Sequence, residues 1–100
     1  MNVFALHTPE DVSRQLAERI KALRLGRNWK RATLAERSGV SEASLKRFER
    51  TGHVSLENLL KLAFTLDRLE ELTSLFAPAP ASSIQELEAS QHNAPKRGRV

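Results

Sequence analysis

A short glycine-containing break between two amphipathic segments is the feature that most constrains how this chain can fold. Residues 30–37 and 42–50 each place apolar side chains at helical spacing along one side. Between them, Gly39 can adopt the positive φ that a tight turn needs, and Ser41 suits the position that caps a helix. The small side chain of Ala35 allows two helices to cross closely. The pattern therefore predicts two helices joined by a sharp turn.

Three further amphipathic segments surround this pair. The first helix is expected to start with Thr8 as its cap and Pro9 at its first position, and to end near residue 26. A fourth helix is capped by Ser55, and a fifth is expected over residues 68–76. The side chains expected to face the core are Val12, Leu16, Ile20, Leu23, Trp29, Leu34, Ala35, Leu45, Phe48, Leu56, Leu59, Leu60, Ala63, Phe64, Leu66, Leu69, Leu72 and Leu75. Because only the stretch Val3–Leu6 resembles a strand, the predicted fold class is all-α with five helices.

The C-terminal part differs in composition from the rest. Pro78 and Pro80 interrupt the helical pattern, and Ser83 with Glu86 forms a capping-box sequence that predicts a short helix to about Ala89. The expected organisation is an N-terminal arm at residues 1–7, a helical domain at 8–77, a linker with a short helix at 78–90, and a disordered basic tail at 91–100.

Charge is distributed unevenly along the sequence. Residues 14–50 hold eleven Lys or Arg against four acids, whereas residues 51–90 hold two against six. A concentration of positive charge of this size is typical of a surface that binds phosphate groups. An ordinary solvated surface would give the same composition, so the charge alone does not decide between the two.

The composition argues against several other classes of protein. The chain has no cysteine, which removes disulfides and thiolate chemistry and fits a reducing compartment. No apolar run approaches the length that crosses a bilayer, so no membrane partner is expected and the predicted location is cytoplasmic.

No catalytic or metal site is expected. The three histidines, His7, His53 and His92, share no helical face at ligand spacing, and no histidine–acid pair could activate Ser41 or Ser44. There is also no glycine-rich phosphate loop. The sequence therefore predicts a protein that is not an enzyme and holds no cofactor.

The stretch from Trp29 to Arg50 resembles the Cro/CI-type (XRE-type) helix-turn-helix family, and the resemblance extends over about Val12 to Phe76. It implies a compact five-helix bundle that binds double-stranded DNA with the second helix of the pair in the major groove. Ser38 departs from the family pattern, which usually has an apolar residue there. Glu42 and Ala43 are an unusual base-reading pair.

The resemblance also implies roles for individual residues. Arg31 stands where the family has a phosphate-contacting glutamine, and Arg47 could pair with guanine while Glu42 accepts from a cytosine amine. Arg24 and Glu49 match a buried salt bridge of the family. The complete set of residues expected to contact DNA is Lys30, Arg31, Ser41, Glu42, Ala43, Ser44, Lys46, Arg47 and Arg50.

A homodimer on a palindromic operator is expected, since one domain makes few base contacts. Its interface is expected to use Val3, Phe4, Leu69, Leu72, Leu75 and Phe76. The chain length, the Thr8-Pro9 helix start and the segment 48–52 also resemble HipB-like antitoxins. These repress their own operon and bind a HipA-family kinase toxin.

Two alternatives stay open. One is a stand-alone repressor of phage or regulatory type without a toxin. The other is a protein-interaction module that lacks DNA binding, against which the cations Lys46, Arg47 and Arg50 argue. The basic tail, with Lys96, Arg97 and Arg99, could add affinity through contacts with phosphate groups or a minor groove, or serve only as a solubilising end.

Overall fold

Four α-helices and one short 3-10 turn make up the part of the chain that the structure describes. The computed structural model describes residues 7–80. The elements are α1 (Pro9–Gly26), α2 (Arg31–Ser38), α3 (Glu42–Thr51), α4 (Leu56–Thr65) and the 3-10 turn η1 (Leu69–Leu72). Within this range there is no strand, which agrees with the predicted all-α class.

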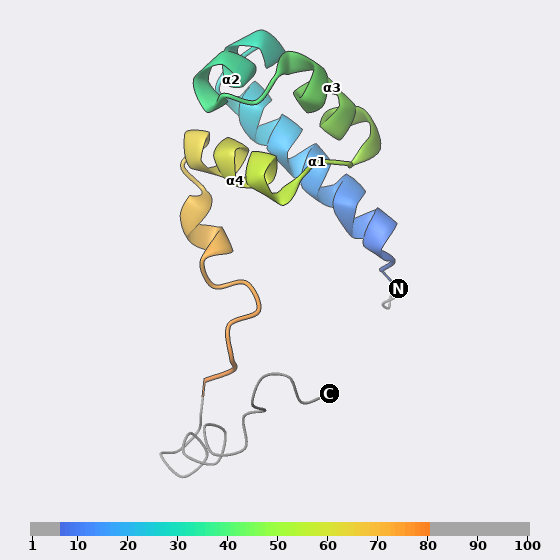
Figure 1. Ribbon diagram of the computed structural model, residues 1–100, viewed down its shortest axis with the longest axis vertical. Coiled ribbons are helices and arrows are strands. Elements are labelled where there is room, and N and C mark those ends of the chain that lie inside the picture. The colour runs from blue at the N-terminus through green and yellow to red at the C-terminus, as the bar shows by residue number, and fades with distance from the viewer. Residues whose placement is uncertain (1–6, 81–100) are drawn as a thin grey trace.

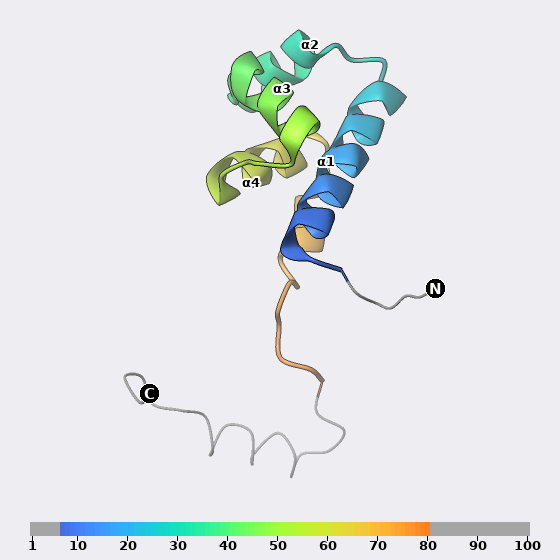
Figure 2. The same ribbon diagram turned by 90° about the vertical axis from the view of Figure 1, so that its right-hand side faces the viewer.

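The helices pack as one small bundle. α3 lies against α1 and α2, α4 packs on α2, and η1 packs on α4 (Figures 1 and 2). None of the helices seen between residues 7 and 80 has the length and apolar character needed to cross a membrane. The strand-like stretch Val3–Leu6, the predicted short helix at residues 83–89 and the basic tail lie outside the described residues.

Side-chain caps start three of the four helices, at the positions that the sequence predicts. The hydroxyl of Thr8 accepts from the backbone N–H of Asp11 at 3.0 Å, and the Asp11 carboxylate accepts in return from the Thr8 N–H. Ser41 and Ser55 accept in the same way from the third residue of α3 and of α4. Each cap pairs a backbone N–H that the helix itself cannot pair.

Two glycines with positive φ end α2 and α3. Gly39 has φ +80° in the turn between the helices, as its position in the sequence predicts. Gly52 has φ +85°, and a Cβ atom there would lie 3.1 Å from the carbonyl carbon and from the Cβ of Ser13. Gly52 therefore allows the end of α3 to approach the backbone of α1, a contact that no sequence pattern indicates.

The core is built around five large side chains that solvent barely reaches, namely Leu34, Leu45, Phe48, Leu62 and Leu66. Ala17, Ile20 and Val40 complete the buried cluster. The predicted inward positions of α2 and α3 are confirmed, because Leu34, Ala35, Leu45 and Phe48 are all buried.

Trp29 is only partly a core residue. It packs against the buried cluster, but it stays half-buried rather than enclosed. The guanidinium carbons of Arg27 and Arg37 lie 5.1 and 4.7 Å from the centre of its ring. Arg27 also donates to the carbonyl of Leu66 and pairs with Asp67 at 3.0 Å, so this cluster ties the α1–α2 loop to the end of α4.

The predicted apolar stripe of α1 is buried only in its second half. Ile20 is buried, but the side chains of Val12 and Leu16 are 41% and 38% exposed, which corrects the prediction for these two residues. The N-terminal turns of α1 extend beyond the other helices (Figure 1), so within the described range little covers this side.

The predicted inward face of α4 is partly wrong. Leu56 is 70% exposed, Phe64 is 68% exposed and Leu60 is also exposed, whereas Leu62 is fully buried. The inward residues are Leu59, Leu62, Ala63 and Leu66. Because α4 carries apolar residues on nearly every side, periodicity alone cannot choose the face that meets the core.

The predicted fifth helix, residues 68–76, is replaced by η1 and a series of turns. Its expected first residue, Arg68, makes no capping bond, and the hydroxyl of Thr73 donates to the carbonyl of Glu70. Such a side-chain bond competes with the helical backbone pattern. A short segment also needs tertiary packing to stay helical, and only Leu69 and Leu72 are half-buried here.

Candidate nucleic-acid interface

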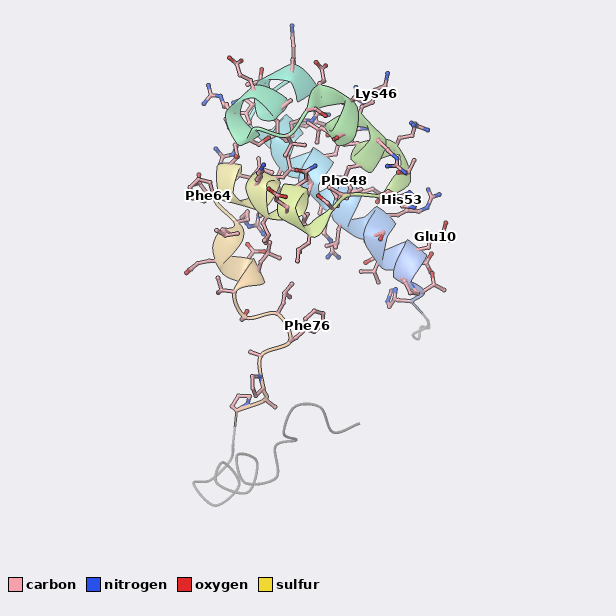
Figure 3. All side chains as sticks on the ribbon, in the orientation of Figure 1. Glu10, Lys46, Phe48, His53, Phe64 and Phe76 are labelled. Carbon is pink, nitrogen blue, oxygen red and sulfur yellow. The ribbon has the colours of Figure 1, made fainter. Side chains whose placement is uncertain are left out.

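The outward side of α3 is polar and carries three cations. Glu42, Ala43, Lys46, Arg47 and Arg50 are all exposed, and Ser44 is half-buried. The buried Leu45 and Phe48 anchor the helix from the opposite side, and Figure 3 shows Phe48 inside the bundle and Lys46 at its surface. The outward orientation predicted for these residues is therefore confirmed, although orientation alone does not test DNA contact.

The start of α3 presents free backbone donors. The Ser41 hydroxyl accepts from the Ser44 N–H at 3.0 Å and lies 2.9 Å from the Ser44 hydroxyl, so both hydroxyl groups are engaged in the cap. The N–H groups of Glu42 and Ala43 have no acceptor among residues 7–80. A helix start of this kind attracts anionic groups, because its free N–H groups and the helix dipole both favour negative charge.

Arg24 and Glu49 form the buried ion pair that the family resemblance implies. Arg24 is 5% exposed, and its Nε and Nη2 donate to the two oxygens of Glu49 at 2.8 and 3.0 Å. Its Nη1 donates to the carbonyl of Trp29 at 2.9 Å. The pair joins α1 to α3, and the third bond fixes the loop that leads into α2.

Arg31 is a third member of this cluster, which no sequence pattern indicates. Its Nε donates to Glu49 Oε1 at 2.9 Å, although its side chain remains 39% exposed. The family resemblance implies only a phosphate contact for Arg31, and the structure shows that one of its donors is already bound. No local signal predicts this bond, because the partners lie 18 residues apart.

Two guanidinium groups therefore share one carboxylate. Burial by itself raises the pKa of the Glu49 carboxyl group, but the hydrogen bonds and charges of Arg24 and Arg31 outweigh burial and lower that pKa below its ordinary value of 4.5. Glu49 is thus ionised in the folded protein, and the cluster keeps one surplus positive charge at the start of α2. Lys30, just before Arg31, is exposed.

A shallow cleft of about 210 Å³ extends the polar surface from α3 to the start of α4. Arg47 and Ser44 line it on one side, and the loop residues His53 and Ser55 with Asn58 line the other. Figure 3 shows His53 at the loop that follows α3. No sequence pattern marks His53 and Asn58 as site residues, because their place beside Arg47 depends on the fold of the loop.

The residues predicted for a dimer interface differ in their exposure. Leu69 and Leu72 are half-buried, Leu75 is 55% exposed and Phe76 is fully exposed. Val3 and Phe4 lie outside the described residues. An apolar groove of about 520 Å³ runs along α4, lined by Leu56, Glu57, Leu60, Lys61, Phe64 and Leu69.

Between residues 7 and 80, no three His, Asp or Glu side chains are grouped as a metal ion would need.

A family model described as helix-turn-helix matches residues 20–72, which is more than half of the chain and includes α2, α3 and α4. No curated protein gives a significant match to the sequence.

Proposed function

The chain belongs to the Cro/CI-type (XRE-type) helix-turn-helix family of DNA-binding regulators, and from this premise we propose that it is a repressor that reads a specific operator with α3. The observation that carries the proposal is the outward side of α3. Lys46, Arg47 and Arg50 are exposed there on a helix whose other side is locked into the core. A helix of this width fits the major groove of B-form DNA.

We assign base contacts and phosphate contacts to different residues. Arg47 pairs with a guanine, Glu42 accepts from a cytosine amine, and the small Ala43 permits close approach to a base edge. Phosphate groups are held by Lys30, Arg31, Ser44, Lys46 and Arg50 and by the free N–H groups that follow Ser41. Arg47 also lines the cleft with His53 and Asn58, so the proposed DNA-binding surface continues from α3 to the start of α4.

The test is binding to a duplex that contains the protein's own promoter region, measured for the wild type, Arg47→Ala and the control Arg37→Ala over a series of salt concentrations. Arg37 lies in the last turn of α2 over the Trp29 ring, so its loss removes the same charge away from α3. We expect tight, salt-dependent binding that Arg47→Ala weakens by about 1–3 kcal/mol and Arg37→Ala leaves nearly unchanged. Equal losses for both variants would show non-specific binding, and no binding by the wild type would favour an interaction module.

We further propose that two copies bind a palindromic operator and that they meet through the apolar groove on α4. Leu56, Leu60 and Phe64 recur every fourth residue and form an exposed stripe, which suits antiparallel pairing with the same stripe of a second copy. Glu57 and Lys61 flank the stripe and pair with each other at 3.5 Å. In an antiparallel pair, each could face the opposite charge of the other copy.

Within this class of repressors, we propose an antitoxin of a HipBA-like operon that represses its own transcription and binds a HipA-family kinase. The support is the resemblance of the capped Thr8-Pro9 start and of the segment 48–52 to HipB-like proteins. Co-expression with a kinase-like neighbouring gene should give a stable complex and relieve growth inhibition. If no such gene adjoins this one, the stand-alone repressor is the better assignment.

A further inference from the structure

We propose that Glu49 is a positioning residue that holds Arg31 ready for a DNA phosphate group. This inference rests on the proposed DNA-binding function and assigns a role in it to a carboxylate that DNA would not touch. The side chain of Glu49 is 2% exposed, whereas that of Arg31 is 39% exposed. Arg31 therefore reaches from the buried carboxylate to the surface at the start of α2.

The donors of Arg31 are divided between the two environments. Its Nε bonds to Glu49 at 2.9 Å, and its two Nη groups make no hydrogen bond to any residue between 7 and 80. The guanidinium group is planar, so fixing Nε on one side also fixes the direction of the Nη donors. Those donors form the edge that contacts a phosphate group through two parallel bonds.

Arg31 is not needed to neutralise Glu49. Arg24 already contacts both oxygens of that carboxylate with two donors and brings the compensating charge into the core. Arg31 adds a second positive charge that no acid among the described residues balances. A phosphate group bound to Arg31 would supply a negative charge to pair with this second positive charge.

Holding the side chain in advance also reduces the entropy lost on binding. An arginine that is free in solution must be immobilised when it contacts phosphate, and the bond to Glu49 removes part of that cost before DNA arrives. The expected gain in affinity is roughly two- to tenfold.

The test is a double-mutant cycle on the promoter duplex with Glu49→Gln, Arg31→Gln and the two combined. Arg31→Gln should weaken binding and reduce the slope of log affinity against log salt by about 0.9, as the loss of one phosphate contact does. Glu49→Gln as a single substitution should weaken DNA binding two- to tenfold. Added to Arg31→Gln, it should have no further effect on binding. The melting curve of each variant, followed by the fluorescence of the single Trp29, shows which variants are folded at the temperature of the assay.

Arg31→Lys provides a second variant that does not depend on the stability of Glu49→Gln. Lysine keeps the charge but cannot bond the carboxylate and a phosphate group through one rigid plane. We expect Arg31→Lys to lose most of the affinity that Arg31→Gln loses, while Arg37→Lys at the other end of α2 changes little.

Three outcomes separate this proposal from the function on which it rests. If Glu49→Gln weakens binding equally with and without Arg31, Glu49 acts through the fold and the positioning role is rejected. Full affinity of Arg31→Lys would reject it as well. If the wild type does not bind the promoter duplex at low salt, the proposed function itself is rejected. The double-mutant cycle then yields no binding affinities to compare.

Discussion

Arg24 donates to both oxygens of Glu49, through Nε at 2.8 Å and Nη2 at 3.0 Å, across 25 residues of sequence. Replacing Arg24 with methionine leaves this buried carboxylate with Arg31 as its remaining charged partner. We expect Arg24→Met to lower the free energy of unfolding by about 3 kcal/mol, the lower end of the usual 3–5 kcal/mol because Arg31 remains. Urea denaturation followed by Trp29 fluorescence measures the change.

Arg19→Met is the matched control for this prediction. Arg19 is an exposed residue of the same helix and has no ion pair within residues 7–80. Its replacement should change the free energy of unfolding by less than about 0.5 kcal/mol. Similar losses in both variants would mean that the Arg24–Glu49 pair contributes little, and that methionine is simply unfavourable in α1.

The stability of the protein should fall in acid partly through Glu49. The pKa of Glu49 is lower in the folded chain than its ordinary value of 4.5, so the unfolded chain binds the proton more readily. This stabilisation is fully present above about pH 4.5 and is lost as the pH falls through the lower pKa of the folded state. Melting temperatures between pH 7 and pH 3 should therefore fall more steeply in the wild type than in Glu49→Gln. Parallel curves for the two proteins would contradict the prediction.

The two positive-φ glycines should differ in their response to alanine. The Cβ atom added by Gly39→Ala has no neighbour within 4 Å. This substitution should lower the free energy of unfolding by about 1 kcal/mol, because of the φ of +80° alone. Gly52→Ala has the same backbone cost and also meets the backbone of Ser13 and Arg14 at 3.1–3.2 Å, so it should cost about 1–3 kcal/mol more. Chemical denaturation of the two variants measures the difference. Equal costs would show that α1 moves aside without penalty.

The apolar stripe on α4 should control the oligomeric state without controlling the fold. Phe64 is 68% exposed, so Phe64→Ser should leave the melting temperature of the monomer unchanged and weaken self-association. Sedimentation at several concentrations measures the association. A wild type that stays monomeric at the highest concentration would exclude this interface.

Leu62→Ala is the contrasting variant on the same helix. Leu62 is fully buried, and its truncation should lower the free energy of unfolding by about 2–5 kcal/mol. If Phe64→Ser destabilised the chain as strongly, the exposed position of Phe64 would be wrong.

Much of the local structure could be predicted from the sequence because its causes are local. Thr8, Ser41 and Ser55 cap helices through bonds to residues three positions away, and Gly39 ends α2 because a positive φ favours glycine. The prediction of a fifth helix is wrong because that helix would depend on tertiary packing rather than on local causes. Spacing alone suggests it, but only Leu69 and Leu72 among residues 68–76 are half-buried, and the others are exposed.

The sequence by itself determined where three helices begin, which class of fold they form and which side of α3 is polar, since these depend on capping, turn geometry and the alternation of apolar and polar residues. Only the tertiary structure decided that Leu62 rather than Phe64 is buried, and that Arg31 shares Glu49 with Arg24. An amphipathic pattern cannot choose between two apolar sides of α4. A bond between residues 18 or 25 positions apart exists only after the helices have packed.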